Sequence, residues 1–426
     1  MQNKAWIGVG VAGVAAVIAV LMLWPPATRF VLDTWQGDAL REERQAITDP
    51  LTSDHWSAAR AADKGVTIWD PINAERGFTL YTSGEGPIAR LVTMTGAPVH
   101  EWTIPYSRAW TPEKAAVKEP QPDDLVFLRD ARVLPNGDLI AVFEAAGHLP
   151  AGYGMVKVDK DSRPVWSYLE RAHGGFDMTP DGRVLVLVQS IQQDSRPSST
   201  IETPYLEDFL VLLSPAGKEL AKISLVEALE RSRFASLLDN APPDEHDPLG
   251  ATSVQYLGGN PVKGAPDSAG ERVLLSFGML DAVAILDVPS RKIVWAKRGE
   301  WQSQHEARAL PDGDLMIADA PADNESRVQQ IDLSTGTVIW SYGGGTDEPF
   351  ASATGLSARR LANGNTLLTE SEGGRLVEVD GTGTVLWEYT NPVRGGPADY
   401  YIPVVAAAQR IDARSLDASF IGFKRP

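Results

Sequence analysis

The chain has 426 residues, 43% hydrophobic and 22% charged, which is the composition of a globular protein rather than a disordered one. Its 39 Lys and Arg against 56 Asp and Glu give a formal net charge of −17 without a dense basic cluster, which excludes nucleic acid as a partner. Because there is no cysteine, disulfides, thiolate catalysis and cysteine-based metal sites are excluded. The six histidines show no HExxH or HxH spacing, so we expect no metal and no cofactor.

An apolar segment begins the chain. Residues 5–24 form twenty positions without a charge, preceded by Lys4 and followed by Pro25 and Pro26. Such a helix spans about 30 Å of hydrocarbon, so we predict a transmembrane anchor over residues 1–27. The alternative is a cleaved signal peptide, whose apolar core is normally ~7–15 residues long. The positive-inside rule predicts a single pass through an inner membrane, with the N-terminus in the cytoplasm and the remainder in the periplasm.

Small residues follow one face of this predicted helix. Gly8, Ala12 and Ala16 recur at every fourth position, which lets a second transmembrane helix approach closely. We therefore predict a membrane-protein partner that contacts these residues, although the same stripe also fits a weakly hydrophobic anchor without a partner. A polar neck is predicted over residues 28–60, ahead of a folded domain at 61–426.

A repeated hairpin organises the rest of the chain. Asn-Gly and Asp-Gly between apolar runs predict two-residue β-hairpins, because both central positions of that turn favour φ > 0. A third strand and a fourth strand follow each hairpin, and units of four strands are typical of propeller blades. The hairpin segments are ARVLPNGDLI (131–140), FDMTPDGRVLVL (176–187), ARALPDGDLMI (307–317) and ARRLANGNTLL (358–368).

Six units can be counted, so the predicted fold is an all-β, six-bladed propeller. The first unit lacks its opening strand, and VVAAAQRI (404–411) matches the missing piece, so we predict that the C-terminal strand closes the ring and removes its exposed edges. Leucines at helical spacing predict a helical insertion near 224–238 on one face of the disc. The units are 77–105, 130–169, 173–225, 251–299, 305–344 and 355–392.

Tryptophans recur at the ends of fourth strands, namely Trp166, Trp295, Trp340 and Trp387. Each repeat places the residue at the same point of the blade. We therefore interpret them as packing anchors between blades, in preference to a ligand cage.

These repeats resemble the bacterial arylsulfotransferase-like family. The segment LSARRLANGNTLLTESEGGRLVEVDGTGTVLWEYTNP (356–392) carries the resemblance most fully, and QHEARALPDGDLMIADA (304–320) supports it. The resemblance implies a six-bladed propeller and an aryl sulfate as ligand. It also implies transfer of the sulfuryl group from an aryl ester to a phenol through a sulfated histidine, with cationic or hydrogen-bonding groups around the sulfuryl oxygens.

The site residues follow from that resemblance position by position. His305 matches the nucleophile and His173 a supporting histidine. Gly250 stands where the family has a second supporting histidine, Thr252 where it has an asparagine, and Gly278 where it has an arginine. Since glycine offers no side-chain donor or charge, the resemblance implies a site that lacks two of its groups.

Three functions compete on these observations. The first is a membrane-anchored binding or accessory subunit with a degenerate site, in effect a pseudoenzyme. The alternative is an active aryl-sulfate sulfotransferase that works through a sulfohistidine at His305, where His246 could restore a cationic group if its loop folded inward. The third, a quinone-cofactor dehydrogenase, shares the blade motif, but that class usually has eight blades and a cofactor site with cysteines, both missing from this sequence.

Overall fold

The computed structural model describes residues 42–422 apart from 48, 195–200, 243–245, 267–268, 321–325, 345–349 and 353–354. The chain divides into two compact units, Met1–Arg41 and Glu42–Pro426. The anchor predicted over residues 1–27, with Gly8, Ala12 and Ala16, lies outside the described residues. Within the described ranges, no helix combines the length and the apolar character that crossing a membrane requires.

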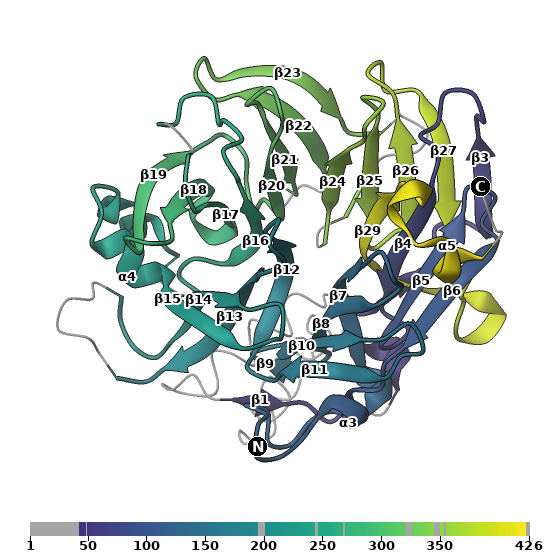
Figure 1. Cartoon of the computed structure of the whole chain (residues 1–426), viewed down its shortest axis with the longest axis horizontal. Helices are drawn as coiled ribbons and strands as arrows, with labels where there is room; N and C mark the ends of the chain where they lie inside the picture. Colours follow the sequence, from purple (N-terminus) through teal and green to yellow (C-terminus); the bar gives the residue numbers. More distant parts are fainter. Residues whose placement is uncertain are drawn as a thin grey trace, which may run out of the picture. The chain divides into compact units, whose positions relative to one another are not determined.

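The second unit is a ring of six blades, viewed down its axis in Figure 1. Five of these sheets have four strands and the sixth has five, which confirms the six-bladed propeller. From the innermost strand outward, blade 1 consists of β29 (Val405–Ile411), β4 (Phe78–Ser83), β5 (Ile88–Thr93) and β6 (Pro98–Thr103). Blade 2 consists of β7 (Val126–Val133), β8 (Leu139–Ala145), β10 (Gly152–Val158) and β11 (Pro164–Tyr168). Blade 3 consists of β12 (Ala172–Met178), β13 (Val184–Gln192), β14 (Tyr205–Leu213) and β15 (Glu219–Ser224).

The other three blades follow the same order. Blade 4 consists of β16 (Ala251–Tyr256), β17 (Arg272–Phe277), β18 (Ala282–Asp287) and β19 (Lys292–Arg298). Blade 5 consists of β20 (Glu306–Ala309), β21 (Leu315–Asp319), β22 (Arg327–Asp332) and β23 (Thr337–Tyr342). Blade 6 consists of β24 (Ser357–Arg360), β25 (Thr366–Glu370), β26 (Arg375–Val379), β27 (Val385–Thr390) and β3 (Gly65–Trp69).

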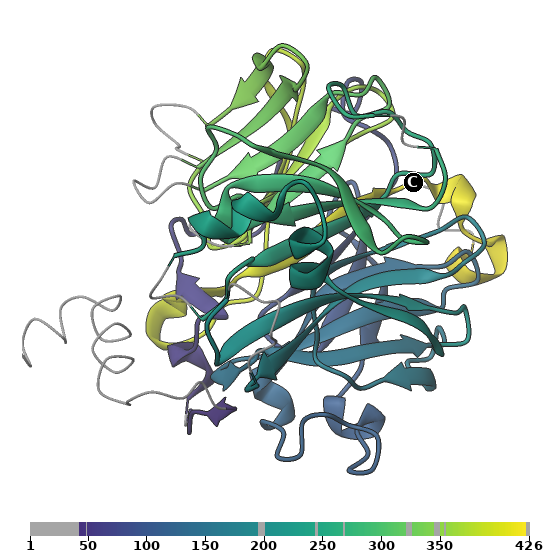
Figure 2. The ribbon, with the colours of Figure 1, turned by 90° about the vertical axis from the view of Figure 1, so that its left-hand side faces the viewer.

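The C-terminal strand closes the ring as predicted. Strand β29 pairs antiparallel with β4, from Val405 opposite Ser83 to Ile411 opposite Phe78. In Figures 1 and 2 the yellow C-terminal segment lies among the blue strands that begin the domain. Blade 1 thereby gains its innermost strand and has four strands, like blades 2 to 5.

Part of the segment predicted as a neck belongs to the propeller unit, which begins at Glu42. Strand β1 (Glu43–Arg44) pairs with β9 (His148–Leu149), and β2 (Trp56–Ala58) pairs with β28 (Tyr401–Pro403). The predicted neck over 28–60 therefore includes residues that add short strands to the ring.

The remaining elements are the helices α3 (Tyr106–Ala109), α4 (Leu225–Glu230) and α5 (Ala418–Ile421) and 3-10 turns at Pro50–Thr52, Asp123–Leu125, Ala235–Asn240, Gly278–Leu280, Pro397–Asp399 and Ala413–Ser415.

Tryptophans of the outer strands join neighbouring blades, as the sequence predicts. The indole of Trp387 in blade 6 is fully buried and donates to the carbonyl of Met94 in blade 1 over 2.8 Å. Trp166 in blade 2 donates to the carbonyl of Pro215 in blade 3 over 3.1 Å. Each ring thus buries apolar area and satisfies a backbone acceptor of the adjacent turn.

The insertion near 224–238 is two short helices rather than one. Helix α4 is capped by Ser224, whose hydroxyl accepts from the amide of Glu227, and it ends at Glu230. The side chain of Ser232 then donates to the carbonyl of Leu229 and accepts from the amide of Phe234, which replaces the helical hydrogen bonds. The buried leucines pack with strands of blades 3 and 4, so the insertion lies against their outer parts (Figure 1).

Candidate functional site

The innermost strands of the six blades bring their first residues to one mouth of the channel. These strands are β7, β12, β16, β20, β24 and β29, and each is the inner edge of its sheet (Figure 1). Hydrogen bonds join equivalent levels of adjacent strands: the amide of Phe176 donates to Asp130, and the amide of Ala307 donates to Ser253. The strands therefore run in the same direction, and His173 and His305 both belong to this mouth.

Backbone bulges interrupt four of these strands at the same level. The pairing register shifts at Arg129, at Gly174 and Gly175, at Thr252 and at Ala406. A bulge turns a side chain away from the ladder and is common beside functional sites. Here one guanidinium N–H of Arg129 donates to the carbonyl of Ala406 over 3.3 Å, which holds a cation at the mouth. The sequence analysis did not identify Arg129, because a bulge depends on pairing rather than on residue spacing.

His173 is held by a buried carboxylate. Its Nε2 lies 3.1 Å from Oδ1 of Asp208, while Oδ2 of Asp208 accepts from the amide of Ala251 over 3.1 Å. Asp208 is fully buried and the His173 side chain is 12% exposed. Burial disfavours the imidazolium, but the hydrogen bond and the charge of Asp208 outweigh it and raise the pKa of His173. A protonated imidazole is a donor and a cation rather than a nucleophile.

Asp247 completes this acidic cluster. Burial and the neighbouring charge of Asp208 raise the pKa of Asp247 to about 7. Its Oδ1 accepts from the amide of Gly250 over 2.7 Å, and its Oδ2 accepts from Nε2 of Gln189 over 2.8 Å. The ionisation of His173 and that of Asp247 are therefore linked, because Asp208 lies beside both groups and its charge raises both pKa values.

A second charged pair lies between blades 2 and 3. Oε1 of Glu144 accepts from the amide of Gly174 over 2.7 Å, and its Oε2 lies 3.9 Å from Nε of Arg129. The ring of His55 packs against Phe127 with centroids 3.9 Å apart, and burial lowers the pKa of His55. Glu144 and Arg129 both act on that pKa, so a histidine from the N-terminal segment adjoins the same pair.

His305 is fixed at its backbone and half-buried. Its amide donates to the carbonyl of Ala318 over 3.0 Å. The preceding residue, Gln304, is fully buried, and its side-chain amide donates to the carbonyls of Phe277 and Ala282 in blade 4. Thr252 lies between the two histidine strands: its hydroxyl is 3.4 Å from the carbonyl of Gln304.

Gly250 and Gly278 lie backbone to backbone. The amide of Gly278 donates to the carbonyl of Gly250 over 2.9 Å. Gly250 has φ of +53°, and a Cβ placed there would lie 2.7 Å from Cγ of Met279. A Cβ at Gly278 would lie 3.2 Å from the carbonyl oxygen of Gln304. The positions that the resemblance assigns to a histidine and an arginine are therefore packed with backbone and Met279.

His246, expected as a substitute cation, lies on the surface. Its Nδ1 is 3.3 Å from the carbonyl of Pro204, and its own carbonyl accepts from the amide of Leu206. The group of His, Asp and Glu side chains needed to hold a metal ion is not found among the described residues.

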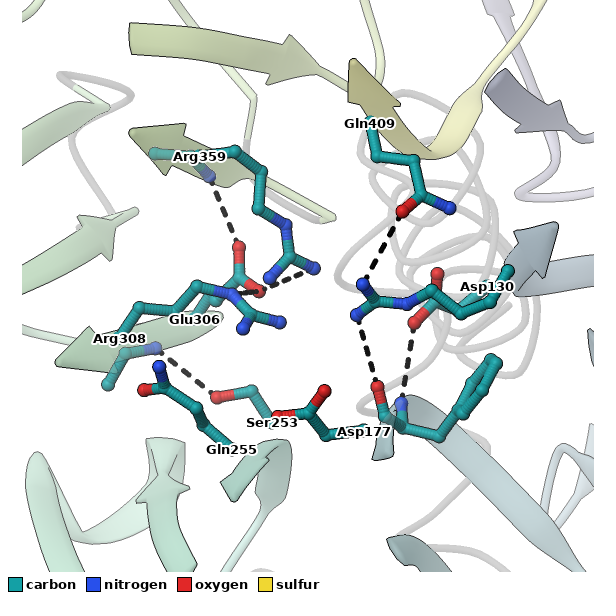
Figure 3. A network of polar contacts seen from close by, with 12 residues as sticks. Asp130, Asp177, Ser253, Gln255, Glu306, Arg308, Arg359 and Gln409 are labelled. Atoms are coloured by element: carbon teal, nitrogen blue, oxygen red, sulfur yellow. Dashed lines mark hydrogen bonds and ion pairs between the residues drawn. The ribbon is translucent and has the colours of Figure 1, made fainter. Parts of the chain in front are cut away.

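Further along the channel, polar side chains join adjacent inner strands (Figure 3). Ser253 and Gln255 of blade 4 accept from amides of blade 5, and Glu306 of blade 5 accepts from the amide of Ala358 in blade 6. Nε2 of Gln409 in blade 1 donates to the carbonyl of Ala131 in blade 2. Side chains thus link the inner strands of blades 4, 5 and 6 and those of blades 1 and 2.

Together, the ring of six blades and the polar mouth define a β-propeller with a candidate site at the channel entrance. The profile of the family described as arylsulfotransferase (ASST) matches residues 130–392, more than half of the chain. The chain therefore belongs to that family. No curated protein matches the chain in sequence.

Solved structures similar to the chain share little sequence with it. A protein of unknown function from Bacteroides caccae is 13% identical, covers 78% of this chain and 99% of its own, and gives a TM-score of 0.48. The WD40 propeller domain of Doa1 is 12% identical over 79% of this chain and 87% of its own, with a TM-score of 0.41. Virginiamycin B lyase from Staphylococcus aureus is 10% identical over 62% and 69%, with a TM-score of 0.36.

Proposed function

We propose that this protein is a membrane-anchored periplasmic propeller that acts as a binding or accessory subunit of a membrane complex, with a degenerate sulfotransferase site. The observation that carries the proposal is the contact between Gly250 and Gly278, whose space is taken by backbone and by Met279. Loss of one preorganised donor typically costs about 2.7–4 kcal/mol of transition-state stabilisation, and two such positions are lost here.

The character of the whole chain supports the same proposal. A net charge of −17 gives no long-range attraction for an aryl sulfate, whose own charge is negative. The uncharged segment 5–24 supplies an anchor by its length, and its small residues supply a surface for another membrane helix.

Co-purification in mild detergent tests the accessory role. We expect wild-type full-length protein to carry a membrane-protein partner, and we expect the triple variant Gly8→Ile, Ala12→Ile, Ala16→Ile to lose it. Gly10→Ile is the matched control, because on a helix position 10 faces away from position 8. If the triple variant retains every partner that the wild-type protein retains, docking through this stripe is wrong.

The second candidate is an active aryl-sulfate sulfotransferase. It is supported by His173 held on Asp208 and by the cation of Arg129 at the mouth. In this reaction an imidazole nitrogen of His305 attacks sulfur, the S–O bond to the aryl group breaks, and the phenolate leaves. The oxygen of a second phenol then takes the sulfuryl group from the imidazole, and the phenol proton passes to solvent or a nearby base.

Intact mass spectrometry after incubation with 4-nitrophenyl sulfate separates the two candidates. For the accessory subunit we expect no covalent adduct. A sulfuryl adduct that disappears in His305→Ala and persists in His246→Ala would establish the enzyme and overturn the degenerate site.

A further inference from the structure

Hydrogen-bond donors outnumber acceptors at the centre of the channel. Arg308 of blade 5 and Arg359 of blade 6 point toward one another beside Glu306 (Figure 3). Oε1 of Glu306 accepts from Nε of Arg308 over 2.8 Å and lies 3.0 Å from a terminal nitrogen of Arg359, while Oε2 accepts from the amide of Ala358. The carboxylate of Glu306 is therefore the ion-pair partner of two guanidinium groups.

The other carboxylates of the channel are also occupied. Both oxygens of Asp130 accept from backbone amides, those of Ala131 and Phe176. Both oxygens of Asp177 do the same, with the amides of Met178 and Tyr256. Neither carboxylate has an oxygen that is not already an acceptor.

Several arginine donors remain. Nε of Arg359 and Nε of Arg132 are buried without a hydrogen-bond partner among the described residues. Arg308 uses only its Nε in the described part of the chain, which leaves the donors on its two terminal nitrogens. An arginine side chain stays protonated in proteins, so it keeps all of its N–H donors. Buried donors normally have hydrogen-bond acceptors.

The channel also has room for water or an ion at this level. The side chains of Arg308 and Arg359 are 15% and 19% exposed although they point inward. The carboxylates that face Arg132, Arg308 and Arg359 already accept hydrogen bonds with their oxygens. The remaining N–H groups can be satisfied by an acceptor that has no donors of its own, and a small anion meets that condition.

We propose that Arg308 and Arg359, with Arg132 across the channel, bind a small inorganic anion such as a halide at the centre of the propeller. The anion accepts from the surplus N–H groups and links blades 2, 5 and 6 through their inner strands. This site goes beyond the function proposed above, because it requires neither membrane docking nor sulfuryl transfer and can fail without either.

Bromide is the probe for the experiment. The thermal midpoint of the full-length protein in detergent is measured against bromide, with gluconate keeping the ionic strength constant. We expect a saturable rise for wild type, because a ligand that binds only the folded state stabilises it. Arg308→Gln and Arg359→Gln should lose most of the rise. Arg163→Gln, which removes a 74% exposed cation of blade 2, should keep it.

Anomalous diffraction from bromide-soaked wild-type crystals is the second readout and does not depend on variants that fold. We expect a peak between Arg308 and Arg359. An ordered water without anomalous signal at that position would overturn the proposal. So would a bromide response that is absent from wild type or equal in Arg163→Gln and Arg308→Gln.

Discussion

The amide of Gly278 donates to the carbonyl of Gly250 over 2.9 Å, so the two positions that the family resemblance assigns to basic groups contact each other through their backbones. A Cβ at Gly278 would lie 3.2 Å from the backbone oxygen of Gln304, and one at Gly250 would lie 2.7 Å from Cγ and 3.1 Å from the amide nitrogen of Met279. Both positions are therefore filled by the packing of blade 4 and of the segment that enters blade 5.

This contact predicts that replacing Gly250 lowers the stability of the folded protein. Gly250→Ala should lower the free energy of unfolding by about 2–4 kcal/mol, from a left-handed backbone cost of ~1–2 kcal/mol and the overlap with Met279. Gly336→Ala is the control, because Gly336 also has positive φ but open space around its Cβ, so it should cost only the backbone part. Urea unfolding measures both variants. Equal losses would show that the overlap is relieved without cost.

The second prediction concerns the tryptophan contacts between blades. Trp387→Phe should destabilise the protein by about 2–4 kcal/mol, because it leaves the buried carbonyl of Met94 without a donor and replaces the indole, over which the Arg410 guanidinium lies at 4.6 Å, by a smaller ring. Trp166→Phe should cost about 1 kcal/mol or less, because the half-buried Trp166 leaves the carbonyl of Pro215 near solvent. Chemical denaturation tests the ranking, and the reverse order would contradict it.

The fold could be predicted from the sequence because each blade is specified by sequence patterns within a few residues. The Asp-Gly turn at 312–313 and the Asn-Gly turn at 136–137 specify their hairpins within a few residues, and β29 could be matched to a missing first strand by its pattern. The end of helix α4 at Glu230 could not be predicted from the sequence, because it depends on side-chain hydrogen bonds of Ser232 that compete with those of the helix.

The surroundings of the candidate site could be predicted only in part. The family resemblance points to His305, His173 and the two glycines as candidate positions, but not to the residues that surround them. Asp208 contacts His173 from another strand of the blade, and His55 reaches Phe127 from the N-terminal segment. Contacts between residues far apart in sequence, like the bulge at Arg129, leave no periodic signal.

The third prediction is a pH dependence of stability caused by Asp247. Its pKa is raised from 3.8 to about 7, so between these values the folded protein holds a proton that the unfolded chain has lost. The contribution of Asp247 to the free energy of unfolding therefore falls as pH rises from about 4 to about 7. His173 acts in the same direction, since stability from a raised histidine pKa is lost as pH rises through that pKa.

Asp247→Asn should remove the larger part of this slope, with Gln189 reversing its amide to face the new side chain. Urea unfolding at pH 5, 6, 7 and 8 gives the comparison with wild type. Asp181→Asn is the control: Asp181 is exposed and its pKa is lowered by hydrogen bonds from Thr179 and Arg183, so this variant should leave the slope above pH 5 unchanged. A slope that survives Asp247→Asn would assign it to other buried groups.

The last prediction tests whether Asp208 sets the protonation of the mouth. In Asp208→Asn the imidazole of His173 loses its charged partner while remaining buried, so the pKa of His173 should fall. The pKa of Asp247 should also fall, because a neighbouring negative charge is removed. NMR titration of the histidine ring signals in wild type and in the variant measures the first change. If the pKa of His173 stays the same, Asp208 does not hold it in the cationic form. If it falls, the imidazolium form of His173 persists over a narrower pH range, and any anion bound at the mouth through it should bind more weakly as pH rises.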